Sequence, residues 1–249
     1  MMQVAQILKS ALGGNDISAA DAEILFGTQG DQAEAVFDCA DKIRKECIGD
    51  AVTYVINRNI NFTNVCYMGC TFCAFSKRRE NDTSELLPIS EIVRRAREAY
   101  DRGATEVCIQ GGLHPDIPGN HYLEIVSALK SEIPDIHIHA FSPFEIWYGA
   151  KKSRVSYREY LTQLKARGLG SIPGTAAEIL DTEIRKRLTR DKLTTEQWVD
   201  IITTAHEVGL HSSSTIMYGH VDGPESWAKH LDILRNIQIR TGMFTELVP

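Results

Sequence analysis

The sequence lacks several features that would assign it at once to a common class of protein. No apolar run approaches the ~20 residues that a membrane-spanning helix needs. The opening stretch Met1–Gly14 carries Gln6 and Lys9 among its apolar residues, which is unlike a signal peptide. The net charge is −6, so the basic excess that favours nucleic-acid binding is missing. We therefore expect no membrane partner and no nucleic-acid partner.

Cysteine is scarce and unevenly spread. Of the six cysteines in 249 residues, Cys66, Cys70 and Cys73 fall within a single short segment. Disulfide scaffolds are normally small, secreted and much richer in cysteine, so this distribution argues against one and predicts a reducing, cytoplasmic setting. A chain of this length with 43% hydrophobic residues can bury a sizeable core.

Residues 1–50 are predicted to be a helical segment, with an amphipathic helix over Asp31–Lys45. From residue 51 to 249 the pattern alternates between strand and helix. Strands are predicted at Val52–Asn61, Glu106–Gln110, Ile136–Ala140, Leu169–Ile172, His211–Tyr218 and Met243–Val248. Helices are predicted at Ser90–Arg102, His121–Glu132, Tyr157–Arg167, Ala176–Leu188, Glu196–Val208 and Glu225–Ile239. Alternation with short connections favours a parallel α/β fold.

Several strands have one polar face, which favours a barrel over an open sheet. In the third strand Ile136 and Ile138 share one face, and His137 and His139 share the other. Strands of a doubly wound sheet are normally apolar on both faces, whereas a polar face fits a lumen that holds a polar ligand. Because the chain stops at Pro249 without a helix after its sixth strand, we expect a partial (β/α)6 TIM-like barrel that lacks its C-terminal closure.

The cysteine loop follows the first strand and has the spacing C-x₃-C-x₂-C. Three thiolates suit a [4Fe–4S] cluster with one iron left open for a small molecule. The alternative is structural zinc, which prefers four ligands, and Cys108 or His114 could supply the fourth. Phe72, just before the last cysteine, could shield a cluster or could simply pack in the core.

Further candidates follow other strands. Gly111 and Gly112 follow the second strand and would let the backbone approach a ligand, although a plain turn is a fair alternative. Glu178 follows the fourth strand and could be a solvated acid in the first turn of a helix. Residues at or near strand ends on the expected mouth of the barrel are His139, Ser142, Tyr218 and Glu246. His139 could accept a proton or donate a hydrogen bond, and a buried Glu246 would need a polar partner.

The cysteine loop resembles that of the radical S-adenosylmethionine (radical SAM) superfamily. The resemblance implies a SAM molecule on the open iron and a 5′-deoxyadenosyl radical after one-electron cleavage. It also implies that Gly111 and Gly112 contact the methionine part of SAM, that Ser142 lies in the cofactor site, and that Glu178 binds the ribose hydroxyls. The acidic residue usual after the glycine pair is replaced here by Leu113.

The segments Asn57–Cys66, His137–Pro143 and Ser214–His220 resemble a smaller group of these enzymes. That group comprises the two halves of FO synthase, which makes the deazaflavin precursor of coenzyme F(420), and the radical SAM enzymes of the futalosine route to menaquinone. Pro173–Leu180 and Phe244–Pro249 are most similar to the CofH-type half, the 5-amino-6-(D-ribitylamino)uracil–L-tyrosine 4-hydroxyphenyl transferase family.

The resemblance implies that the 4-hydroxybenzyl group of L-tyrosine is transferred to the ribitylaminouracil. His139, Tyr218 and Glu246 would be the catalytic or substrate-contacting residues. It further implies a CofG-type FO synthase subunit and a low-potential electron donor, a flavodoxin or ferredoxin, as partners. The alternatives are a menaquinone-route enzyme, a zinc-stabilised binding module and a non-catalytic truncated fragment.

Overall fold

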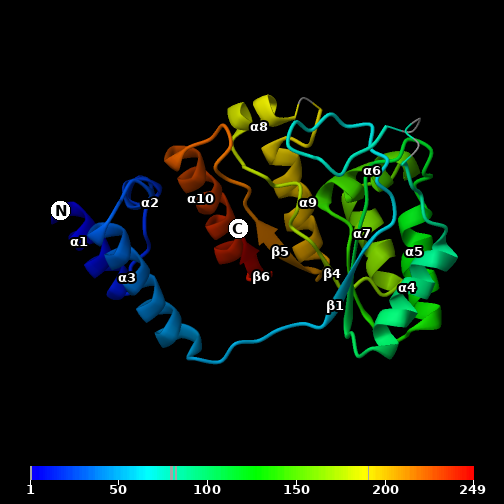
Figure 1. The fold of residues 1–249 in the computed structure, drawn as a ribbon, viewed down its shortest axis with the longest axis horizontal. Helices are drawn as coiled ribbons and strands as arrows, with labels where there is room; N and C mark the ends of the chain where they lie inside the picture. The colour runs from blue at the N-terminus through cyan, green and yellow to red at the C-terminus, as the bar shows by residue number, and fades with distance from the viewer. Residues whose placement is uncertain (1, 79–80, 82, 190) are drawn as a thin grey trace.

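The computed structural model describes residues 2–78, 81, 83–189 and 191–249 (Figure 1). Six strands alternate with helices after a helical leader. The strands are β1 (Asn57–Asn61), β2 (Glu106–Gln110), β3 (His137–Ala140), β4 (Ser171–Ile172), β5 (His211–Thr215) and β6 (Phe244–Val248). The helices are α1 (Met2–Leu12), α2 (Ala19–Phe26), α3 (Asp31–Ile48), α4 (Ile89–Asp101), α5 (His121–Glu132), α6 (Pro143–Ser153), α7 (Tyr157–Ala166), α8 (Thr182–Leu188), α9 (Thr195–Glu207) and α10 (Pro224–Thr241).

All six strands form one parallel sheet in chain order, β1-β2-β3-β4-β5-β6. Within the described residues β1 and β6 are not paired with each other, so the sheet is an open, curved part of a barrel. The predicted α/β class and the partial (β/α)6 architecture are confirmed. The carboxyl ends of all the strands lie on one edge, and loops from this edge are expected to carry the chemistry.

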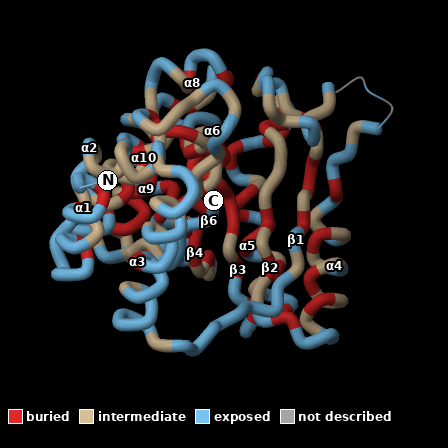
Figure 2. The backbone as a smooth tube through the Cα atoms, turned by 60° about the vertical axis from the view of Figure 1, so that its left-hand side comes forward, coloured by how far each residue is buried: buried red, intermediate tan, exposed pale blue. Residues whose placement is uncertain are grey.

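The hydrophobic core lies between the sheet and its outer helices. Ile60, Ile109 and Ala140 stand side by side in register on adjacent strands and are almost fully buried. They belong to one cluster with apolar residues of α4, α5, α7 and α9. In Figure 2 buried segments run along the inner sides of these helices and parts of the central strands, while much of the leader and the link to β1 is exposed.

The opposite, concave face of the sheet is polar, as predicted. Asn59 lies beside Cys108, Cys108 beside His139, and His139 beside Ser171, so one polar row crosses four strands. The alternation of side chains along each strand separates this row from the buried isoleucines. The concave face is therefore available for polar ligands.

The structure differs from the prediction in several segments. The fourth strand begins at Ser171 and not at Leu169, and the fifth strand ends at Thr215 and not at Tyr218. The first strand begins at Asn57 and not at Val52, because residues 51–56 form an exposed, irregular link. The helix expected from Ala176 begins at Thr182, where Asp181 caps it. A helix that was not predicted, α6, follows β3; its signal is a capping box formed by Ser142 and Glu145 around a proline in the first turn.

The leader helices pack beside the last helix of the barrel. Ser18 caps α2 by accepting a hydrogen bond from the backbone of Asp21. The rings of Phe26 and Trp227 meet edge to face at 5.4 Å, which joins α2 to α10. Figure 1 shows the leader beside α10 and the extended link running from α3 to β1. Division of the chain near residue 50 into two units stays a prediction. In the described part of the chain no helix has the length and apolarity to cross a membrane.

Candidate functional site

A cavity of about 470 Å³ opens at the carboxyl ends of the strands, where the sequence predicted the chemistry. Its wall combines the cysteine loop, the loops after β2 and β3, and the irregular segment before α8. Among the predicted cluster and cofactor residues, those that line it are Cys66, Cys70, Phe72, Cys73, Gly111, Gly112, Ser142 and Glu178. The structure thus brings together every residue that was predicted to hold the cluster or the cofactor.

Backbone hydrogen bonds anchor the cysteine loop at both ends. The amide of Cys66 donates to the carbonyl of Lys77 at 3.1 Å, and the amide of Tyr67 donates to the carbonyl of Leu113 at 3.2 Å. Further along, the amide of Thr71 donates to the carbonyl of Leu188, the last residue of α8. The loop is irregular, yet its position is fixed by β2 on one side and by α8 on the other.

The three thiols are free and partly buried. Burial raises the pKa of Cys66, so its thiolate needs a cationic or metal partner to persist at neutral pH. The sulfur of Cys70 lies 3.4 Å from the hydroxyl of Thr189.

No group of three histidine, cysteine or acidic side chains among the described residues is arranged to hold a single metal ion. A zinc ion gathers all of its ligands on one atom, whereas a [4Fe–4S] cluster spreads its cysteines over different irons. Three separate thiols that share one cavity fit the cluster better than zinc. Cys108 and His114, the possible fourth zinc ligands, are not in the cavity wall.

Close packing after β2 leaves no room for a side chain at Gly111 or Gly112. A Cβ atom on Gly111 would lie 2.6 Å from the ring of Phe62, and one on Gly112 would lie 2.3 Å from the carbonyl oxygen of Val65. The second contact is with backbone directly before Cys66. Gly112 therefore lets the β2 loop lie against the cysteine loop, which a side chain would prevent.

Glu145 is a site residue that the sequence analysis missed. Its carboxylate accepts hydrogen bonds from the amide of Gly111 at 3.0 Å and from the amide and hydroxyl of Ser142 at 2.7 Å each. The residue is 1% exposed, lines the cavity, and joins the ends of β2 and β3. Burial raises the pKa of Glu145 to about 7 in spite of these donors. The capping box S-x-x-E was the signal in the sequence, but it indicated a helix start and not a role in a site.

Lys192 is the second missed residue. Its ammonium group pairs with the carboxylate of Glu178, and both side chains are largely buried. The same ammonium lies 5.1 Å from the centre of the Phe72 ring. Glu178 itself has a positive φ of 46°, which turns the chain into the cavity before α8 begins. No motif in the sequence marks Lys192, because it lies in a loop.

The three residues predicted to contact substrate do not line this cavity. His139 lies one layer closer to the amino ends of the strands than Gln110, a residue of the cavity wall. Its Nδ1 is 2.7 Å from the hydroxyl of Ser171. Burial lowers the pKa of His139 to about 4, and the neighbouring His137 lowers it as well, so the ring is neutral at pH 7.

Tyr218 and Glu246 are exposed. Tyr218 is 57% exposed, and its ring packs edge to face against Trp227 of α10. Glu246 is exposed on β6, and its carboxylate interacts electrostatically with Glu106 of β2. The pKa of Glu106 is raised by burial first and by Glu246 in addition. The predicted roles of His139, Tyr218 and Glu246 stay predictions.

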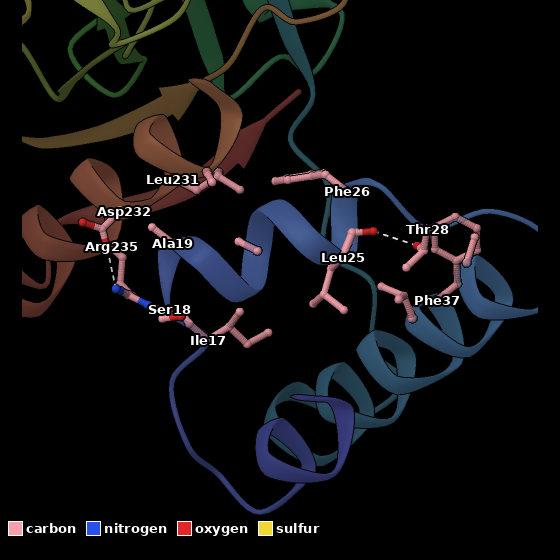
Figure 3. A pocket seen from close by; sticks show the side chains of 14 residues that line it. Ile17, Ser18, Ala19, Leu25, Phe26, Thr28, Phe37, Leu231, Asp232 and Arg235 are labelled. Carbon is pink, nitrogen blue, oxygen red and sulfur yellow. Dashed lines mark hydrogen bonds and ion pairs between the residues drawn. The ribbon is translucent and has the colours of Figure 1, made fainter. Parts of the chain in front are cut away.

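A second cavity, of about 570 Å³, lies between the leader and α10 (Figure 3). Leu25, Phe26, Phe37 and Leu231 give it a mainly apolar wall. Its charged groups, Asp232 and Arg235, are engaged with each other. This cavity has none of the thiols or glycines of the first one, so we assign it no chemistry.

A family model for the radical SAM superfamily matches residues 60–234, from β1 to α10. That range includes the cysteine loop, the glycine pair and Glu178. The chain belongs to the radical SAM superfamily. Its cavity at the strand ends is the place where this architecture carries its loops.

Curated relatives of this radical SAM chain have informative names. It is 56% identical over 225 residues to an FO synthase of Mycobacterium leprae. The aligned region covers 90% of this chain but 26% of that relative. It is 46% identical over 244 residues to a 5-amino-6-(D-ribitylamino)uracil–L-tyrosine 4-hydroxyphenyl transferase of Methanothermobacter thermautotrophicus. That aligned region covers 98% of this chain and 66% of the relative. The chain thus spans about a quarter of the FO synthases and just under two thirds of the transferase. These names do not favour a menaquinone-route enzyme.

Solved structures agree on the fold. The [FeFe]-hydrogenase maturase HydG superimposes with a TM-score of 0.77 at 15% identity, over 100% of this chain and 54% of that one. Methylornithine synthase (PylB) gives a TM-score of 0.71 at 19% identity, over 93% of this chain and 64% of that one. At such identities the likeness speaks for the fold alone.

Proposed function

We propose that the chain carries the radical SAM part of a tyrosine 4-hydroxyphenyl transferase. In this reaction the 4-hydroxybenzyl group of L-tyrosine moves to 5-amino-6-(D-ribitylamino)uracil, which yields the precursor of the deazaflavin FO. The observation that carries the proposal is the gathering of three cysteines, the glycine pair and Glu178 on one cavity, in a chain about half identical to FO synthases.

The cofactors are a [4Fe–4S] cluster on Cys66, Cys70 and Cys73 and a SAM molecule in the same cavity. When bound, they supply a 5′-deoxyadenosyl radical, which begins the reaction by removing a hydrogen atom. The protein binds and orients the cofactors and substrates, and it excludes water from them. Phe72 and Met68 give the cavity apolar surface beside the thiols, which limits the access of water to a reactive species.

The remaining cavity residues orient the cofactor. Gly111 and Gly112 present backbone in the cavity wall to the methionine part of SAM, while Ser142 and Glu145 hold the adjacent loop. Glu178 binds the ribose hydroxyls, and Lys192 keeps its carboxylate in place.

The polar concave face below the cavity takes the substrates. Asn59, Asn61 and Gln110 supply hydrogen-bonding groups at its border with the cavity, which suits a uracil edge and ribityl hydroxyls. His139, neutral at pH 7, is placed to accept a proton or a hydrogen bond one layer below. A CofG-type subunit, a low-potential electron carrier and a cytoplasmic, reducing setting complete the proposal.

The test is anaerobic incubation of the reconstituted chain with SAM, L-tyrosine and the ribitylaminouracil. We expect 5′-deoxyadenosine together with the 4-hydroxybenzyl adduct of the uracil, measured by mass spectrometry. Substituting His139, Tyr218 or Glu246 should abolish the adduct while some SAM cleavage remains. Unchanged adduct formation in these variants would refute their roles, and adduct formation only with futalosine-type substrates would refute the proposed reaction.

A further inference from the structure

A basic hollow lies on the outer side of the cysteine loop. It has a volume of about 460 Å³ and is lined by Tyr67, Pro115, Tyr148, Lys151, Lys152 and Arg154. Its three cations come from the last turn of α6 and the residue that follows it. Among the described residues, no acidic side chain is part of this wall.

The three cations remain exposed. The ammonium of Lys152 donates to the carbonyl of Pro115 at 3.0 Å and lies 5.3 Å from the centre of the Tyr148 ring. Lys151 lies 4.6 Å from the centre of the Trp147 ring, and Arg154 ends α6 in a left-handed conformation. Within the described residues none of the three forms an ion pair. Their charge is therefore free to act on a partner.

The floor of the hollow is rigid. The hydroxyl of Tyr148 donates to the carbonyl of His114 at 2.8 Å and lies near two further carbonyls of the same loop. Burial raises the pKa of Tyr148 to about 12, and the nearby acid Asp116 raises it too, so the hydroxyl keeps its proton. The ring of Tyr67 lies 6.2 Å from that of Tyr148. Two aromatic side chains thus face the cations from a fixed base.

The hollow is one residue away from the cofactor cavity. Cys66 lines the inner cavity, and the next residue, Tyr67, lines the basic hollow. Adjacent Cα atoms are about 3.8 Å apart, so the wall between the two spaces is a single step of the backbone. The guanidinium of Arg78 donates to the carbonyl of Tyr67 at 3.2 Å and adds a further positive charge at this wall.

We propose that this basic hollow is the docking site of an acidic one-electron carrier protein. The inference rests on the proposed function, because it assigns the carrier a surface. In the step concerned, the reduced carrier loses one electron and the oxidised cluster on the other side of Tyr67 gains it; no bond forms or breaks. The chain as a whole has a net charge of −6, so attraction of an acidic partner needs a local basic surface such as this hollow. Electron-transfer complexes are small and transient, which suits a hollow of this size.

Binding is the first test, with a reduced flavodoxin as the probe. The triple variant Lys151→Glu, Lys152→Glu and Arg154→Glu should weaken binding by about ten- to hundred-fold at low salt and should flatten its salt dependence. A control with the same change of charge is Lys9→Glu, Lys42→Glu and Lys45→Glu in the leader, which should bind like the unaltered chain. Equal binding by the two triple variants would overturn the proposal.

Reduction is the second test. In the reconstituted protein, dithionite reaches the cluster without docking. The ratio of flavodoxin-driven to dithionite-driven SAM cleavage therefore measures the contribution of the docking surface to reduction of the cluster. This ratio should fall about tenfold in the hollow variant and not in the leader control. Equal loss with both reductants would overturn the docking role. If neither reductant supports cleavage in the unaltered protein while charge-dependent binding persists, the proposed function fails and the docking surface stands.

Discussion

Replacing Gly112 with alanine tests the contact that positions the cysteine loop. The new methyl group would lie 2.3 Å from the carbonyl oxygen of Val65 and 2.9 Å from the Cβ of Cys66. These neighbours belong to the loop itself and cannot rotate away, so either the β2 loop or Cys66 must move. Overpacking of this kind costs about 1–3 kcal/mol, which corresponds to a fall in Tm of roughly 2–12 °C for a chain of this size.

The matched control for this substitution is Gly69→Ala, in the same loop. A Cβ atom on Gly69 would meet nothing within 4 Å, so the change in stability should stay within about 0.5 kcal/mol. Thermal unfolding and iron content after anaerobic reconstitution are the two measurements. Gly112→Ala should lower both, and Gly69→Ala should lower neither. If Gly112→Ala keeps full stability and full iron content, the loop is not positioned by this contact.

Three further predictions concern Glu145, the pair of Lys192 and Glu178, and the cysteines. In the folded chain burial raises the pKa of Glu145 to about 7, so its contribution to stability is complete below pH 4.5 and is lost as the pH rises through 7. Glu145→Gln should remove this dependence, of about 3 kcal/mol, from unfolding measured between pH 4.5 and 8; an unchanged profile would contradict the assignment. Lys192→Met leaves Glu178 buried without its partner and should cost ~3 kcal/mol in urea unfolding, whereas the double variant with Glu178→Gln should regain part of that loss. Cys108→Ala should keep the iron that Cys66→Ala loses; a chain that binds zinc, takes up no iron and loses its zinc in Cys108→Ala would instead favour the four-ligand zinc site.

The alternation of strands and helices could be predicted because each element has its own period of polar and apolar residues in the sequence. Alternating polar and apolar residues in β3 placed His139 on the concave face and Ile138 in the core, and both positions are confirmed. The cysteine spacing led to the loop, and the resemblance led to Gly111, Gly112, Ser142 and Glu178, which the structure brings to one cavity.

Other features depend on tertiary contacts that no local pattern records. Lys192 pairs with Glu178 across an irregular loop, and Ala176 has a positive φ where a helix was expected. The buried role of Glu145 arises because β2 and β3 end side by side, which brings Gly111 within reach of its carboxylate. Tyr218 looked close to the site along the chain; the amide of the preceding residue, Met217, does donate to the carbonyl of Glu178, but the exposed ring of Tyr218 packs on Trp227.

The proposed chemistry depends on a cluster that Cys66, Cys70 and Cys73 hold and whose open iron binds SAM in the cavity beside Gly112. Electron paramagnetic resonance of the reduced, reconstituted chain, recorded with and without SAM, tests it most directly. We expect a [4Fe–4S] signal that SAM alters in the unaltered chain and that Cys66→Ala abolishes. A signal that SAM leaves unchanged, or a chain that retains zinc and takes up no iron, would contradict it.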